Sequence, residues 1–203
     1  MKNSFPKTDE ILQAHEIFLA KESRDIFYRA ALELVELSRR KEISLKQEEV
    51  ISVLLQTWNM MFYRYKKDHF SEEDFQKLAY LLEAHKEDIK LLRNRSIDDL
   101  QNGDGGNIKE LFHDFELVLG PVGAAKCLHL LAPKFFPLWD RKIAKDGYGL
   151  YIRKMGQNKE IYYEFMQKQK EQCDQFGGEK SLGMNPLKAL DEYNYCKYTK
   201  GWI

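Results

Sequence analysis

Apolar residues recur at helical spacing along most of the 203-residue chain, and this pattern constrains the fold more than any other feature. Leu, Lys, Glu, Gln and Ala dominate, and no stretch sustains the alternation of apolar and polar residues that a half-buried strand requires. The sequence therefore predicts an all-α, multi-helical fold. A chain of this length forms either a single helical domain over residues 1–203 or two helical lobes, 1–100 and 101–203.

Capping and breaking residues divide the expected helices. Ser71 precedes three acidic residues that suit a helix N-terminus, and Asn185 followed by Pro186 marks another start. Three glycines fall between Gln101 and Asn107, where we expect an irregular loop. That loop lacks the oxygen-ligand spacing of a calcium site, so no metal is expected. The expected helices cover residues 9–41 (as one helix or two), 44–66, 71–92, 108–119, 124–131, 159–174 and 186–198.

Charge and cysteine content limit the classes of partner. Basic and acidic residues number 32 each, so no global field draws the chain to a membrane surface or to nucleic acid. The chain offers no run of eighteen uncharged apolar residues, and its first residues, MKNSFPKTDEIL, lack the apolar core of a signal peptide. Three widely spaced cysteines predict neither a disulfide framework nor a zinc site. We therefore expect a cytoplasmic protein without a membrane partner.

One segment, LVLGPVGAAKCLHLLAPKFFPLWDRKIAK at residues 117–145, points to a function. Its glycines predict a short turn from Gly120 to Gly123 between two helices, which is a helical hairpin. The free amide groups of Gly123 and Ala124 would then carry the positive end of the second helix dipole. Such amide groups form a binding site for a phosphate.

The local charge also favours a phosphate ligand. Residues 120–155 contain seven basic and two acidic residues, a net charge of five in a chain that is neutral overall. We expect Lys126, Arg141, Lys142 and Lys145 to approach phosphates, and DNA is the expected partner.

The same segment resembles the helix-hairpin-helix (HhH-GPD) DNA glycosylase superfamily. The resemblance covers LGPVGAAKCLHLL and the following FPLWDRKIAK, within residues 117–145. Val122 and Gly123 align with the hairpin, Pro137 and Asp140 with the Pro/Asp motif of the family, and Lys145 with a basic position.

The resemblance implies an all-α fold with a cleft between two helical lobes, into which a damaged base is flipped. It implies that hairpin amides hold phosphates, in many members with a monovalent cation, and no other cofactor is expected. Asp140 would stabilise positive charge on the sugar and orient the nucleophile. Bifunctional members add a lysine that forms a Schiff base with the sugar.

The family's lysine position falls on Ala125, whereas Lys126 follows one residue later, rotated by about 100° on a helix. Lys126 is therefore the second catalytic candidate after Asp140, and the sequence favours a glycosylase without lyase activity. Asp140 also suits the N-cap of a following helix. Two alternatives stay open: a nucleic-acid-binding module without catalysis, and a helical protein-interaction domain whose protein partners are unknown.

Overall fold

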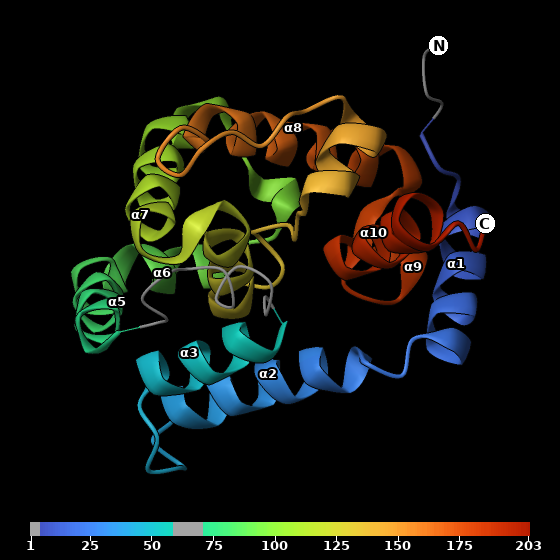
Figure 1. Ribbon diagram of the computed structural model, residues 1–203. Helices are drawn as coiled ribbons and strands as arrows, with labels where there is room; N and C mark the ends of the chain where they lie inside the picture. The colour runs from blue at the N-terminus through green and yellow to red at the C-terminus, as the bar shows by residue number, and fades with distance from the viewer. Residues whose placement is uncertain (1–4, 59–70) are drawn as a thin grey trace.

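The structure, a computed structural model, describes residues 5–58 and 71–203, and these residues form helices and loops without a β-strand (Figure 1). The prediction of an all-α, multi-helical fold is confirmed. The end of the helix expected over residues 44–66 lies outside the described residues. The α-helices are α1 (Thr8–Lys21), α2 (Asp25–Arg39), α3 (Gln47–Trp58), α5 (Glu72–Ala84), α6 (Lys86–Arg93), α7 (Gly105–Leu131), α8 (Lys159–Phe176), α9 (Gly178–Leu182) and α10 (Pro186–Asn194), with short 3-10 turns η1 (Ile97–Asp99) and η2 (Asn102–Asp104) and π-helical turns η3 (Ile143–Gly147) and η4 (Tyr195–Lys200).

Helix α7 is the central element of the fold. It contacts α2, α3 and α5 on one side and α8 on the other. A single cluster of buried residues extends along the chain from Ile11 to Cys196. The first helix, α1, packs on the last α-helix, α10 (Figure 1). The amino-terminal helix thus belongs spatially with the carboxyl-terminal half.

The glycine loop before α7 is shorter than expected. Helix α7 begins at Gly105 and not near Ile108. A Cβ atom at Gly105 would lie 3.1 Å from Cζ of Tyr163, so this glycine permits close packing against α8. Arg95 also pairs with Asp104 at 2.6 Å, which fixes the residues just before the helix.

A kink at Gly120 divides α7 into two helical segments. Gly120 has φ 70° and ψ 168°, which is a region that side chains disfavour, and Pro121 follows directly. Proline suits the first position of a helix because its missing N–H has no intrahelical acceptor there. The expected four-residue turn is therefore wrong: one residue breaks the helix, and Gly123 and Ala124 lie inside the second segment.

An aromatic cluster (Phe112, Trp139, Tyr162 and Phe165) fixes the segment that precedes Asp140. Phe112 stacks on Tyr162 at 4.1 Å between ring centroids, and Trp139 meets Tyr162 edge-on at 5.1 Å. Trp139 Nε1 donates a hydrogen bond of 2.9 Å to the carbonyl oxygen of Pro121 at the kink. The segment that carries Asp140 is thereby joined to the start of the second segment of α7.

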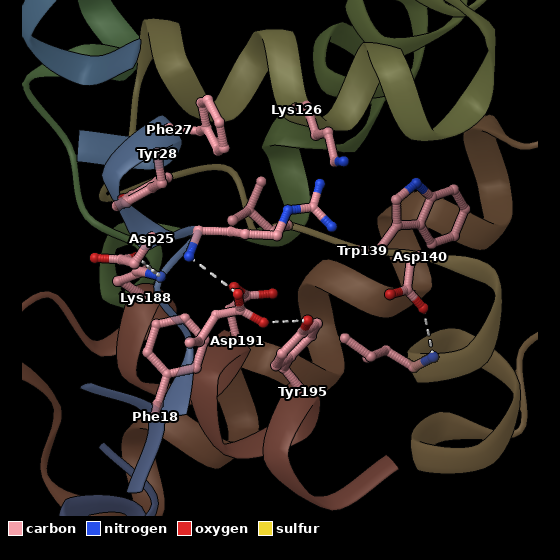
Figure 2. A pocket seen from close by; sticks show the side chains of 14 residues that line it. Phe18, Asp25, Phe27, Tyr28, Lys126, Trp139, Asp140, Lys188, Asp191 and Tyr195 are labelled. Carbon is pink, nitrogen blue, oxygen red and sulfur yellow. Dashed lines mark hydrogen bonds and ion pairs between the residues drawn. The ribbon is translucent and has the colours of Figure 1, made fainter. Parts of the chain in front are cut away.

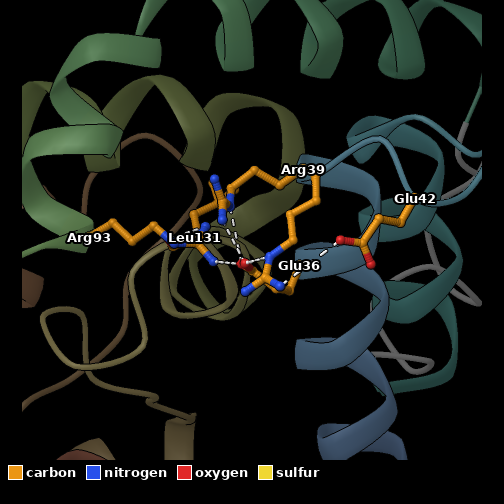
Figure 3. A network of polar contacts seen from close by, with 6 residues as sticks. Glu36, Arg39, Glu42, Arg93 and Leu131 are labelled. Carbon is orange, nitrogen blue, oxygen red and sulfur yellow. Dashed lines mark hydrogen bonds and ion pairs between the residues drawn. The ribbon is translucent and has the colours of Figure 1, made fainter.

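A second polar network joins α2, α6 and the end of α7 (Figure 3). Oε1 of Glu36 accepts hydrogen bonds from Arg39 at 2.5 Å and from Arg40 at 2.6 Å, and its Oε2 contacts Arg93. Arg93 also donates to the carbonyl oxygen of Leu131 at 3.3 Å. Hydrogen bonds from Arg39 and then Arg40, with the charge of Arg93, lower the pKa of Glu36 to about 2 against the burial that opposes them.

Two further findings concern the described part of the chain. No helix within residues 5–58 and 71–203 is long and apolar enough to cross a bilayer. Cys127, Cys173 and Cys196 are buried free thiols.

The Glu36 network has a pH-dependent effect on stability. Because folding lowers the pKa of Glu36, its stabilisation is complete above the unfolded-state value of 4.5 and is lost as the pH falls towards about 2. We expect Glu36→Gln to lower the free energy of unfolding at pH 7 by about 1–3 kcal/mol in urea denaturation. The difference from the parent should shrink between pH 4.5 and pH 3, and a constant difference would contradict this account. Glu42→Gln, at a carboxylate 4.0 Å from Arg40, is the control with little expected effect.

Candidate functional site

A pocket of about 160 Å³ opens between the start of α2, the second segment of α7, the segment at residues 138–143 and α10 (Figure 2). Its lining combines aromatic rings with charges of both signs. This composition suits a ligand that has a planar part and polar groups. The lining residues are Phe18, Phe27, Tyr28, Trp139 and Tyr195 (aromatic), Leu138 and Ile143 (aliphatic), Glu22, Asp25, Asp140 and Asp191 (acidic), and Arg24, Lys126 and Lys188 (basic).

The structure brings the two catalytic candidates into this one pocket. Lys126 reaches it from α7, and Asp140 from the loop before η3 (Figure 2). Both side chains are half-buried. The kink at Gly120 and the hydrogen bond from Trp139 together place the two residues on neighbouring walls.

Asp140 is both a helix cap and a pocket residue. Its Oδ1 accepts a 2.7 Å hydrogen bond from the amide of Ile143, and its carbonyl accepts one of 2.9 Å from Ala144. The second carboxylate oxygen points into the pocket in Figure 2. Capping holds the carboxylate in one orientation, so the cap and the pocket role are compatible.

Lys126 has the environment of a reactive amine. Burial, with a smaller contribution from the charge of Arg24, lowers the pKa of Lys126 from 10.5 to about 8, although the charges of Asp191 and Asp140 raise it. At pH 7 about one-tenth of the amine is then neutral, against fewer than about one in a thousand at the ordinary value. A neutral amine is the nucleophilic form.

A second lysine in the pocket remains a fixed cation. Nζ of Lys188 lies 3.0 Å from Oδ1 of Asp25 and 3.3 Å from Oε1 of Glu192. It also lies over the rings of Tyr28 and Phe18, at 4.3 and 4.5 Å from their centroids. Burial lowers the pKa of Lys188, but the charges of Asp191, Glu192 and Asp25 outweigh it and raise the pKa overall. Lys188 therefore keeps its proton while Lys126 can lose one.

Asp191 adds a carboxyl group that is partly protonated near neutral pH. Burial raises the pKa of Asp191 from 3.8 to about 7, opposed by Lys188 and reinforced by Asp140 and Glu192. The sequence analysis missed both Asp191 and Lys188. Their spacing of three residues on a helix signals a shared face, but nothing local relates that face to Lys126.

Tyr28 is held by a buried histidine. Nδ1 of His129 lies 2.7 Å from the carbonyl oxygen of Phe136, so it must carry the proton, and Nε2 accepts a 3.0 Å hydrogen bond from the Tyr28 hydroxyl. Burial lowers the pKa of His129 to about 4, which keeps the ring neutral. This chain of hydrogen bonds fixes one aromatic wall of the pocket.

The structure corrects the expectation for the hairpin amides. Gly120, Gly123 and Ala124 are buried, and Ala124 has no exposed surface. Trp139 also packs against the kink through its hydrogen bond to Pro121, so a phosphate has no access to the amide of Ala124. The predicted phosphate site at the hairpin is therefore not on the surface.

The basic residues after Asp140 are on the surface, as phosphate contacts require. Arg141, Lys142 and Lys145 are exposed. Arg141 donates to the carbonyl oxygen of Ile152 at 3.2 Å, and Lys142 to that of Thr199 at 3.4 Å. The three exposed side chains are therefore open to an anionic ligand.

The described residues contain no group of three or more His, Cys, Asp or Glu side chains that could hold a metal ion. Comparison with known proteins gives no match to a family model, to a curated protein or to a solved structure.

Proposed function

We propose that this chain is a cytoplasmic DNA-binding protein that removes a base from DNA by cleaving the N-glycosidic bond. One observation carries the proposal: the Lys126 amine and the Asp140 carboxylate line the same pocket. A base flipped out of the duplex would enter this pocket, and the exposed cations Arg141, Lys142 and Lys145 would contact the phosphates around it.

Asp140 would act through its charge. Departure of a base leaves positive charge on the sugar, and a carboxylate held beside C1′ stabilises that charge. The cap to Ile143 keeps one oxygen engaged, so the second oxygen is the one that would face the sugar. This geometry assigns Asp140 an electrostatic role.

Lys126 would supply the nucleophile. Its nitrogen would bond to C1′ as the bond from C1′ to the base breaks, and opening of the sugar ring would then give an imine. The shift of one residue from the family's lysine position favoured a glycosylase without lyase activity. The lowered pKa and the shared pocket support a lyase step instead.

Aromatic side chains would hold the base. Phe27 is 42% exposed at the pocket, while Trp139 and Tyr28 are buried in its wall. Stacking of a base on an aromatic ring is tolerant of base identity and contributes about 1–3 kcal/mol. An exposed ring beside fixed rings is therefore suited to receive a flipped base.

The burial of the hairpin favours a second candidate function. Because the amide of Ala124 has no exposed surface, the kink in α7 cannot hold a phosphate as the family's hairpin does. A helical protein-interaction domain would have the same buried kink and no DNA affinity. Absence of binding to a DNA duplex at low salt would support this candidate, whereas affinity that falls steeply with added salt would exclude it.

Reductive trapping tests the role of Lys126. We expect the parent chain, incubated with an abasic-site duplex and sodium borohydride, to form a covalent protein–DNA complex, because the neutral amine forms an imine with the sugar. Lys126→Ala should lower the yield at least about 100-fold. Lys134→Ala is the control, since Lys134 is an exposed lysine paired with Glu179. Equal trapping by Lys126→Ala would remove Lys126 from the mechanism.

Asp140→Asn tests the electrostatic role of the carboxylate. Asparagine still caps the helix because its side-chain oxygen can accept from the amide of Ile143. We expect release of damaged bases from duplexes to fall by about 100-fold or more, with DNA affinity unchanged within about twofold. Unchanged base release in this variant would show that Asp140 is a cap alone.

A further inference from the structure

Asp191 is an acidic residue of the pocket to which the proposed function assigns no role. It lies on α10, on a different wall from Lys126 on α7 and from Asp140 in the loop before η3 (Figure 2). Its side chain is half-buried. A ligand in the pocket would therefore have the amine, the capped carboxylate and Asp191 around it.

We propose that Asp191 is the acid of this site: it donates a proton to the group that leaves C1′ when Lys126 bonds to that carbon. This inference rests on the proposed function and adds a residue to it. In the step, the bond from the Lys126 nitrogen to C1′ forms and the bond from C1′ to the leaving group breaks. The proton of Asp191 goes to the leaving group, and Lys126 releases its proton to solvent.

Each of the other acidic residues in the pocket is engaged elsewhere. Oδ1 of Asp140 holds the amide of Ile143, and Oδ1 of Asp25 lies 3.0 Å from the Lys188 ammonium. Glu22 accepts from the Tyr195 hydroxyl at 2.6 Å and from the amide of Arg24 at 3.1 Å. These oxygens already have partners within the protein. Although burial opposes it, hydrogen bonds from Tyr195 and the Arg24 amide lower the pKa of Glu22.

Asp191 is in the opposite situation. Burial is the largest influence on it and favours the protonated form, with a pKa of about 7. The groups that face it are Lys188 and Glu192 on its own helix, Lys126 on α7 and Asp140 before η3. The charge of Lys188 is the main influence that lowers the pKa of Asp191. Lys188 also pairs with Asp25 and Glu192, so its charge is shared among three carboxyl groups.

In the reactive state of the Lys126–Asp191 pair, the titratable proton is on the Asp191 carboxyl group and the Lys126 amine is neutral. With ordinary pKa values of 10.5 and 3.8, this state would be about five-million-fold rarer than the ion pair, and the shifts to about 8 for Lys126 and about 7 for Asp191 remove most of that difference. The pocket therefore makes an acid and a nucleophile available together near neutral pH.

The test is the pH profile of cyanoborohydride trapping on a preformed abasic-site duplex, where the leaving group is the hydroxyl of the first adduct. For the full chain we expect a bell-shaped profile with its maximum between pH 7 and pH 8. In Asp191→Asn the rate at the optimum should fall at least tenfold and the decrease on the alkaline side should disappear. The rising limb should also move to lower pH, because the charge that stabilises the Lys126 ammonium is gone.

Two variants complete the test. Asp191→Glu retains an acid and should restore the alkaline decrease, and Asp25→Asn, at another carboxylate of the pocket, should retain the bell shape. A slower Asp191→Asn reaction whose two limbs stay in place would overturn the inference and leave a structural role. Failure of the parent chain to trap at any pH would instead refute the proposed function.

Discussion

The hydrogen bond from Trp139 to the carbonyl oxygen of Pro121 is the interaction on which the site depends. Pro121 follows the only non-helical residue of α7, and Trp139 precedes Asp140. The bond and the aromatic cluster around it therefore bring two parts of the chain together at the kink. These contacts are what place the Asp140 carboxylate and the Lys126 amine in the same pocket.

The pocket that results separates the roles of charged residues by their surroundings. Lys188 and Lys126 are the same kind of side chain in different surroundings. Two carboxylates and two aromatic rings surround the Lys188 ammonium. Burial and the charge of Arg24 favour loss of the proton from Lys126. The same contrast separates Asp140, which is engaged as a cap, from Asp191, which burial protonates. Opposed environments of this kind divide acid, base and nucleophile among like residues in enzyme sites.

Local signals in the sequence predicted much of the fold and part of the site. Ser71 caps α5 and Asn185 caps α10, because capping depends only on residues within one helical turn. Lys126 and Asp140 were found because they lie in one short motif. Lys188 and Asp191 were missed because tertiary packing, including that of α10 on α1 and α8, brings α10 to the pocket. The exposure of the hairpin was predicted wrongly for a related reason: Trp139, which covers it, lies 18 residues further along the chain.

The proposed chemistry requires that the Lys126 amine is accessible from a pocket and loses its proton at a lower pH than a lysine of ordinary pKa. The most direct measurement is trace reductive methylation with formaldehyde and cyanoborohydride at pH 7, followed by peptide mass mapping. We expect Lys126 to be labelled at least about tenfold faster than the exposed Lys142, because the pKa of Lys126 is lowered to about 8. Labelling of Lys126 no faster than Lys142 would contradict it.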